Sequence, residues 1–158
     1  MTSTSKPAKS ATKAATKRTK AFNDIELEAM RAKTAEEKAA RKGKATREAG
    51  EKDLLSKIDE MKEPDKALAT RIHAIVTKAA PELMPKTWYG MPAYAKADKI
   101  VCFFQSGQKF KTRYATFGFQ DPAQLDDGNM WPTAFALTKL TVSDEERIAK
   151  LVKQAVGG

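Results

Sequence analysis

The sequence predicts an α+β fold, a two-layer sandwich in which helices pack on one face of an antiparallel sheet. Apolar residues recur with a helical period of about 3.6 between residues 64 and 81. After Pro85, β-branched and aromatic residues take over and are separated by glycine and proline breaks, which is typical of strands. Another helical stripe ends the chain. Because helices flank a run of strands, they cover one sheet face most economically.

Residues 1–20 are predicted to form a disordered basic arm. They contain no aromatic and no branched aliphatic residue, so they cannot bury enough surface to offset the entropy of ordering. The arm holds six Lys or Arg and no acid, within a net charge of +9 for the whole chain. Such an arm can neutralise nucleic-acid phosphates without sequence preference, or it can serve only for solubility. The candidate nucleic-acid residues are Lys6, Lys9, Lys13, Lys17, Arg18 and Lys20.

Residues 21–52 are predicted to form a charged helical extension and a linker. Their Ala, Glu, Lys and Arg content, with acids early, favours a solvated helix. Larger apolar residues such as Ile25 and Met30 occur only near its start, so docking is expected to be weak beyond the first two turns. Gly43 and Gly50 are interpreted as fraying and linker positions.

The folded domain is predicted to span residues 53–158 and to contain three helices. The first has an apolar face made of Leu54, Ile58 and Met61. Pro64 opens the second helix and Pro81 ends it. The apolar stripe of that helix consists of Leu68, Ile72, Ile75, Val76 and Ala79. The third helix is expected to begin at a capping box of Ser143 and Glu146, and its stripe is Ile148, Leu151, Val152 and Ala155.

Three or four strands are predicted between these helices. They are Thr87–Tyr89, Lys99–Gln105, Lys109–Phe119 and, less clearly marked, Thr133–Leu137. The segment from Gly90 to Pro92 is interpreted as an interruption, and Ser106 to Gln108 as a hairpin turn. The apolar parity of the third strand flips after Tyr114, which predicts a bulge or bend near Ala115 or Gly118.

A ligand site is predicted in the strand region. The alternation of the third strand places Lys109, Lys111 and Arg113 on one face, where three cations repel one another unless an anion, acids or solvent relieve them. Nearby aromatic side chains favour an anionic or aromatic ligand through cation-π and hydrogen-bond contacts. Core packing of the aromatics and protection of a sheet edge by the cations are the alternatives. The candidate ligand-binding residues are Trp88, Tyr89, Tyr94, Lys109, Lys111, Arg113, Tyr114 and Trp131.

No catalytic residue and no cofactor is predicted. The only histidine, His73, flanks an apolar stripe, and no nucleophile elbow or phosphate-binding glycine loop occurs. One Cys and one His cannot supply the four ligands of a structural zinc site. The carboxylates of Asp59, Glu60 and Glu63 are weak metal candidates, because interleaved lysines neutralise the field that would concentrate a cation.

The chain is expected to be a soluble cytoplasmic protein. Its longest strongly apolar run, Ile100 to Phe104, is far shorter than the roughly twenty residues that cross a bilayer, so no membrane association is expected. The N-terminus lacks the apolar segment of a secretory signal, although its Ser, Thr and Ala content is also found in organelle transit peptides. Cys102 is the only cysteine and is predicted to be a buried hydrophobe, which fits a reducing compartment.

The segment Lys-Thr-Trp-Tyr-Gly-Met-Pro-Ala-Tyr, residues 86–94, and the strand from Lys99 to Phe104 resemble the YdhG-like domains, a family of unknown function. The resemblance covers residues 53–156, and Met-Trp-Pro-Thr at 130–133 looks like a subgroup with a charged N-terminal extension. Such domains are similar in fold to frataxin, and some are described as iron chaperones. The resemblance therefore implies a helix-sheet sandwich. Together with the candidate ligand-binding residues, it leads us to expect a non-enzymatic YdhG-like binding domain for a small or anionic ligand. Nucleic-acid association through the arm and a frataxin-like iron chaperone are the alternatives.

Overall fold

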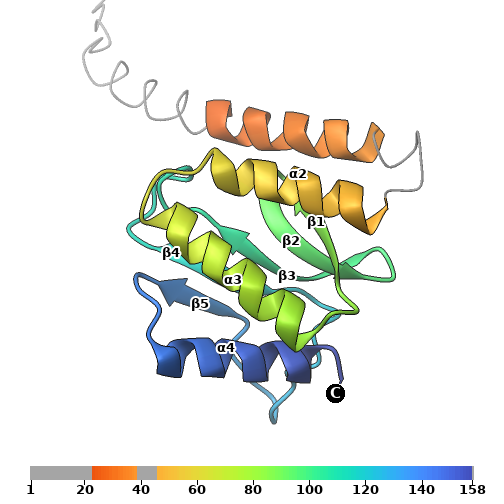
Figure 1. Cartoon of the computed structure of the whole chain (residues 1–158), viewed down its shortest axis with the longest axis vertical. Helices are drawn as coiled ribbons and strands as arrows, with labels where there is room; N and C mark the ends of the chain where they lie inside the picture. Colours follow the sequence, from red (N-terminus) through yellow and green to blue (C-terminus); the bar gives the residue numbers. More distant parts are fainter. Residues whose placement is uncertain (1–22, 39–45, 158) are drawn as a thin grey trace, which may run out of the picture.

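The structure, a computed structural model, describes residues 23–38 and 46–157 and has the predicted α+β class. The predicted basic arm and Gly43 lie outside these ranges. A helix occupies residues 23–38. The other helices are α2 (Arg47–Asp59), α3 (Asp65–Ala79) and α4 (Val142–Ala155). The strands are β1 (Met84–Trp88), β2 (Met91–Lys96), β3 (Lys99–Gln105), β4 (Ala115–Phe119) and β5 (Ala134–Leu137). Figure 1 shows α2, α3 and α4 together on one side of the sheet.

The five strands form an antiparallel meander in the order β1-β2-β3-β4-β5. Cross-strand partners point to the same face of a sheet, and alternate residues along a strand point to opposite faces. One face supplies Tyr94, Cys102, Phe104 and Phe117, all fully buried, to the core. The helices cover this face with buried Leu54, Ile72, Val76 and Val152. The opposite face, called the outer face below, carries Phe103 and its neighbours.

The apolar pattern located α3 and β3 well. The predicted stripe of α3 is confirmed, because Leu68, Ile72, Ile75 and Val76 are buried in that helix. The strand predicted over Lys99–Gln105 is confirmed at both ends as β3. The stripe of α3 keeps a helical period from Leu68 to Ala79, whereas the short apolar run of β3 is rich in β-branched and aromatic residues and is bounded by turn residues.

Helix α2 begins at Arg47, earlier than the expected start near Asp53. The Thr46 hydroxyl caps it by accepting a hydrogen bond from the amide of Ala49 (3.1 Å). Gly50 is a buried helical residue and not a linker position, so that expectation was wrong. A Cβ atom at Gly50 would lie 2.2 Å from the backbone oxygen of Pro85, and glycine therefore lets α2 lie directly against β1.

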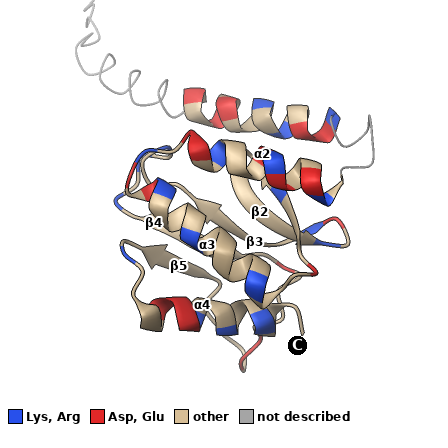
Figure 2. Cartoon of the chain, viewed as in Figure 1, with Lys and Arg blue, Asp and Glu red and all other residues tan. Residues whose placement is uncertain are grey.

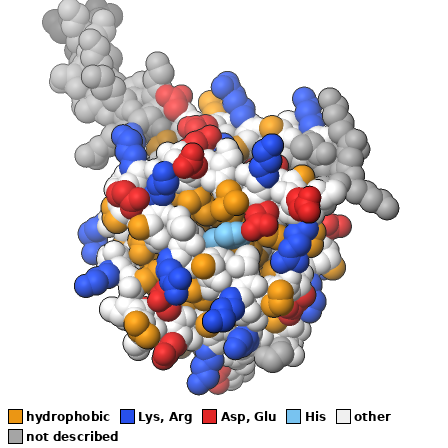
Figure 3. Space-filling model, viewed as in Figure 1, with side chains coloured by type: hydrophobic (Ala, Val, Ile, Leu, Met, Phe, Trp, Pro, Cys, Tyr) orange, Lys and Arg blue, Asp and Glu red, His pale blue; other side chains and the backbone are white. Residues whose placement is uncertain are grey.

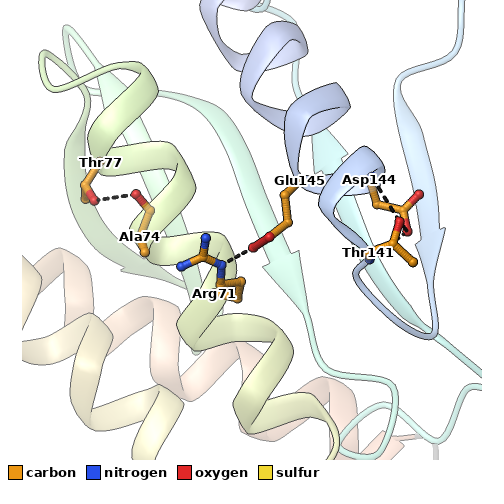
Figure 4. Close-up of polar contacts among 6 residues, drawn as sticks. All are labelled: Arg71, Ala74, Thr77, Thr141, Asp144 and Glu145. Atoms are coloured by element: carbon orange, nitrogen blue, oxygen red, sulfur yellow. Dashed lines mark hydrogen bonds and ion pairs between the residues drawn. The ribbon is translucent and has the colours of Figure 1, made fainter.

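The cap of α4 also differs from the prediction. Thr141, not Ser143, is the N-cap, and its partner in the capping box is Asp144, not Glu146. The Asp144 carboxylate accepts hydrogen bonds from the amide (2.9 Å) and the hydroxyl (2.8 Å) of Thr141, and these bonds lower the pKa of Asp144. An ion pair between Arg71 and Glu145 then links α3 to α4 (Figure 4).

The strand region contains two further corrections. The predicted interruption at Gly90–Pro92 is a tight turn followed by β2, a strand that was not predicted. The predicted strand Lys109–Phe119 is strand only from Ala115 onward, because residues 107–114 form a loop. The parity flip near Tyr114 therefore marks the end of this loop and not a bulge. The one register shift in the sheet lies between Tyr94 and Ala95.

The helix at residues 23–38 docks on the turn between β1 and β2. Lys33 Nζ donates a hydrogen bond to the Tyr89 hydroxyl (2.7 Å), and Glu36 accepts one from the Gly90 amide (3.1 Å). These contacts lie beyond the first two turns, where only weak docking was expected. Met30 is 62% exposed and does not anchor the helix. Polar side chains directed at one turn therefore make the hydrogen bonds that hold the helix in place.

Candidate functional site

A cavity of about 440 Å³ lies where four segments meet. They are the helix at residues 23–38, the end of α2 with the turn after it, the β1–β2 turn, and the loop at 107–114 with Ser106 before it. We call this cavity the basic pocket because three lysines line it. Its lining residues are Glu28, Lys57, Glu60, Met61, Lys62, Gly90, Ser106, Gln108 and Lys109.

A buried carboxylate holds one wall of the basic pocket in place. Asp65, the first residue of α3, is only 4% exposed. It accepts hydrogen bonds from the Ser106 hydroxyl (2.6 Å) and from the Gln108 amide (2.9 Å). The Lys109 amide in turn donates to the Ser106 hydroxyl oxygen (3.2 Å). Because a buried carboxylate without partners is costly, this network fixes the loop that carries Lys109.

The position of the Lys109 side chain depends on the glycine opposite. Gly90 has a φ of +76°, a conformation that L side chains rarely adopt. A Cβ atom there would lie 2.9 Å from the Lys109 Nζ atom. Glycine thus allows both the tight turn and the close approach of the ammonium group.

The charges around the basic pocket are mixed, with a surplus of cations. Lys57 pairs with Glu60 at 3.4 Å. Within residues 23–38 and 46–157, no carboxylate oxygen lies within 4.0 Å of the Nζ atoms of Lys62 or Lys109. Glu28 is the second acid in the lining. The arrangement therefore offers two ammonium groups without a direct carboxylate partner, which suit phosphate or carboxylate oxygens.

The structure does not bring the eight predicted ligand-binding residues together. Lys109 alone lines the basic pocket. Arg113 and Tyr114 line a separate cavity of about 170 Å³ beside Asp65, with the guanidinium 5.4 Å from the tyrosine ring centre. Lys111 is exposed in the same loop, with a φ of +56°. The expected row of three cations on one strand face is wrong, because these residues do not lie in a strand.

The aromatic candidates separate in the same way. Tyr94 is buried in the core, and Trp131 is partly buried against it. Trp88 and Tyr89 pack edge to face with ring centres 5.0 Å apart. The Tyr89 hydroxyl is the hydrogen-bond partner of Lys33, and this bond raises the lysine pKa. Core packing, the alternative for the aromatics, thus applies to Tyr94 but not to Trp88.

His73 forms a hydrogen-bonded chain with a buried tyrosine. Its Nδ1 atom lies 2.8 Å from the Tyr94 hydroxyl, and its Nε2 atom lies 2.9 Å from the Glu51 carboxylate. A neutral imidazole satisfies both contacts when Nε2–H donates to Glu51 and the tyrosine hydroxyl donates to Nδ1. Burial raises the pKa of Tyr94 well above its usual range. In Figure 3 the histidine, pale blue, is seen on the helix-covered face.

The three weak metal candidates have other partners. Asp59 pairs with Lys66 at 3.0 Å, and Glu60 pairs with Lys57. Glu63 accepts a hydrogen bond from the amide of Ala67 (3.1 Å). Acidic and basic positions alternate along α2 (Figure 2). In the described part of the chain, no three His, Cys, Asp or Glu side chains come together as a metal site would require.

Sequence reasoning found Lys109 but missed Lys57, Lys62 and Gly90. The two lysines lie in a stretch of alternating charge that is typical of any solvated helix end. Gly90 was noticed only as a break between strands. A turn glycine beside an aromatic pair was the available signal, but nothing in the sequence shows that it faces Lys109.

Comparison of the chain with models of protein families, with curated proteins and with solved structures gave no match. Among the helices of residues 23–38 and 46–157, none is both long and apolar enough to cross a membrane.

Proposed function

We propose that this protein is a binding domain for a small anionic ligand, which it holds in the basic pocket. The observation that carries the proposal is the convergence of Lys57, Lys62 and Lys109 on one cavity of about 440 Å³. Two of these ammonium groups have no carboxylate within 4.0 Å in the described part of the chain. The cavity has the size of a small-molecule site.

The ligand class follows from the donors. Two lysines from different segments act as adjustable point charges, which suit an anion with several oxygens such as a phosphate ester or a polycarboxylate. Glu28 and Glu60 stand at the same cavity and can accept hydrogen bonds from a hydroxyl or amino group. A ligand that combines an anionic end with a donor group fits this lining best.

The role proposed is binding without catalysis. The lining holds no histidine, cysteine or tyrosine, and Ser106, its one hydroxyl, already donates to Asp65. Membership of the YdhG-like family belongs to the same proposal, on the basis of residues 86–94 and the strand at 99–104. Ligand binding in the basic pocket depends on the residues that line it and not on that membership.

The test is calorimetric titration of the full chain with inorganic pyrophosphate and with citrate. Replacing Lys62 and Lys109 with alanine together is expected to weaken binding at least about tenfold, which equals about 1.4 kcal/mol. The matched control replaces Lys78 and Lys111, two exposed lysines outside the basic pocket, with alanine. It removes the same charge and should change the affinity less than about threefold. Equal weakening by both pairs would contradict a specific pocket.

A further inference from the structure

The outer face of the sheet carries two partly exposed aromatic side chains, Trp88 and Phe103. Its residues follow from the register, in which Lys86, Ala93, Phe103, Gly118 and Ala134 form one row across all five strands. The neighbouring positions on this face are Trp88 and Met91 on β1 and β2, and Gln105, Thr116 and Ala136 on β3, β4 and β5. Helices α2, α3 and α4 lie on the other side of the sheet (Figure 1).

Two aromatic rings form a platform on this face. The ring of Phe103 lies across Gly118, because a Cβ atom at Gly118 would be only 2.4 Å from Phe103 Cζ. The ring of Trp88 is 5.4 Å from that of Phe103, centre to centre. Both side chains are partly exposed and lie outside the core cluster. Glycine at 118 therefore leaves room for the Phe103 ring over the sheet, where it and the Trp88 ring, inclined at 58° to each other, stay partly exposed.

The outward-facing sheet positions around this aromatic platform, Trp88 and Phe103, carry mostly small side chains and no acid. Ala134 and Ala136 are exposed, and they leave a shallow floor beside the rings. Among the outward-facing positions in the register, Lys86 is the only charged residue. On the sheet itself, a ligand on the platform thus meets apolar surface, π faces and one cation.

We propose that the aromatic platform binds single-stranded nucleic acid by stacking bases on Trp88 and Phe103. Aromatic side chains on an open sheet face accept any base, since every base has a π face. The charge of the chain complements a polyanion, because it is +9 overall and the first twenty residues hold six cations and no acid.

Charge also argues against other occupants. A second copy of the chain would bring two Lys86 side chains and two net charges of +9 together. A duplex keeps its bases stacked inside, so it cannot offer them to a flat sheet face. The aromatic platform and the basic pocket share no residue. A result against one proposal therefore does not contradict the other.

The test uses the full chain with Trp131→Phe, which leaves Trp88 as the only tryptophan. We expect an oligothymidylate of about 15 nucleotides to quench the Trp88 fluorescence as it binds at low salt. An abasic strand of the same length keeps the phosphates but cannot stack. It should bind at least about fivefold more weakly, the loss expected for one stacked base. Equal binding of both strands, or binding without quenching of Trp88, would overturn the proposal and assign the association to charge alone.

Two variants with the same added charge distinguish an effect on the aromatic platform from a general effect on fold or charge. Ala136→Glu adds an acid at an exposed position beside the aromatic platform, and Val142→Glu adds the same charge at a 72% exposed position on α4. We expect Ala136→Glu to weaken oligothymidylate binding at least about tenfold, while Val142→Glu changes it less than about threefold. Equal effects, no binding by the parent chain, or self-association that only Ala136→Glu disrupts would each overturn the proposal.

Discussion

Replacing Gly50 with alanine separates two opposite expectations for the start of α2. Helix propensity alone predicts a gain in stability of about 0.5 to 1 kcal/mol, because alanine loses less conformational entropy than glycine. The structure predicts a loss. The new Cβ atom would lie 2.2 Å from the Pro85 oxygen, which is a backbone atom and cannot rotate away. Forcing the helix away from β1 costs about 1 to 3 kcal/mol, the range for overpacked cores.

We therefore expect Gly50→Ala to lower the free energy of unfolding by about 0.5 to 2 kcal/mol, the packing cost less the gain in helix propensity. Urea unfolding followed by circular dichroism measures this directly. Ser56→Ala is the matched control, since Ser56 is exposed on the same helix and should change stability by no more than about 0.5 kcal/mol. A Gly50→Ala protein as stable as the parent, or more stable, would refute the contact between α2 and β1.

Three further predictions test the core and the cap of α4. Tyr94→Phe removes the buried hydroxyl that hydrogen-bonds to the only histidine, and it should lower the free energy of unfolding by about 1 to 3 kcal/mol. Tyr114→Phe, at an exposed position, should change it by no more than about 0.5 kcal/mol in the same unfolding assay. Cys102 should resist a thiol reagent until the protein unfolds, because burial raises the pKa of its thiol; rapid labelling of the native chain would contradict this. The folded-state pKa of Asp144 is lowered, so its contribution to stability is complete above the usual carboxyl pKa of about 4 and disappears as the pH falls through the lower folded value. Asp144→Ala should thus lower stability at neutral pH and flatten its decline in acid, while Glu146→Ala should leave that decline unchanged.

The elements that the sequence predicted well are those whose apolar pattern and flanking breaks agree. The stripe of α3 keeps a helical period between two prolines, the apolar run of β3 is short, β-branched and aromatic, and both were located correctly. The fold class follows from their order along the chain. Local pattern and tertiary packing agree in these segments, so no distant contact is needed to predict them.

Strand β2 was missed because Pro92 was interpreted as a break. Proline cannot donate a hydrogen bond inside a sheet. Pro92 pairs with Thr87 of β1, but the ladder between β2 and β3 begins only at Ala93, so the missing donor has no partner to satisfy. Pro92 fits in a strand because it lies where the ladder between β2 and β3 has not yet begun. Only the three-dimensional register reveals that position.

The loop at 107–114 was mistaken for a strand because its residues alternate. Its conformation depends on Asp65, more than forty residues earlier, which holds Ser106 and the Gln108 amide. A hydrogen bond from the Thr112 amide to the Gly107 oxygen (2.8 Å) then closes the loop. Sequence patterns describe local periodicity and do not predict hydrogen bonds to a residue as distant as Asp65. The candidate site was therefore only partly predictable, since Lys109 depends on this loop and its partner lysines on another segment.

The most direct test of the proposed function is an NMR titration of the full, nitrogen-15-labelled chain with inorganic pyrophosphate. Binding in the basic pocket predicts saturable shifts of the amide signals of Gly90, Ser106, Gln108 and Lys109, together with signals at the end of α2. Small, non-saturating shifts spread over all lysine-rich segments would show that the anion senses only the net positive charge, and would contradict a ligand site in this pocket.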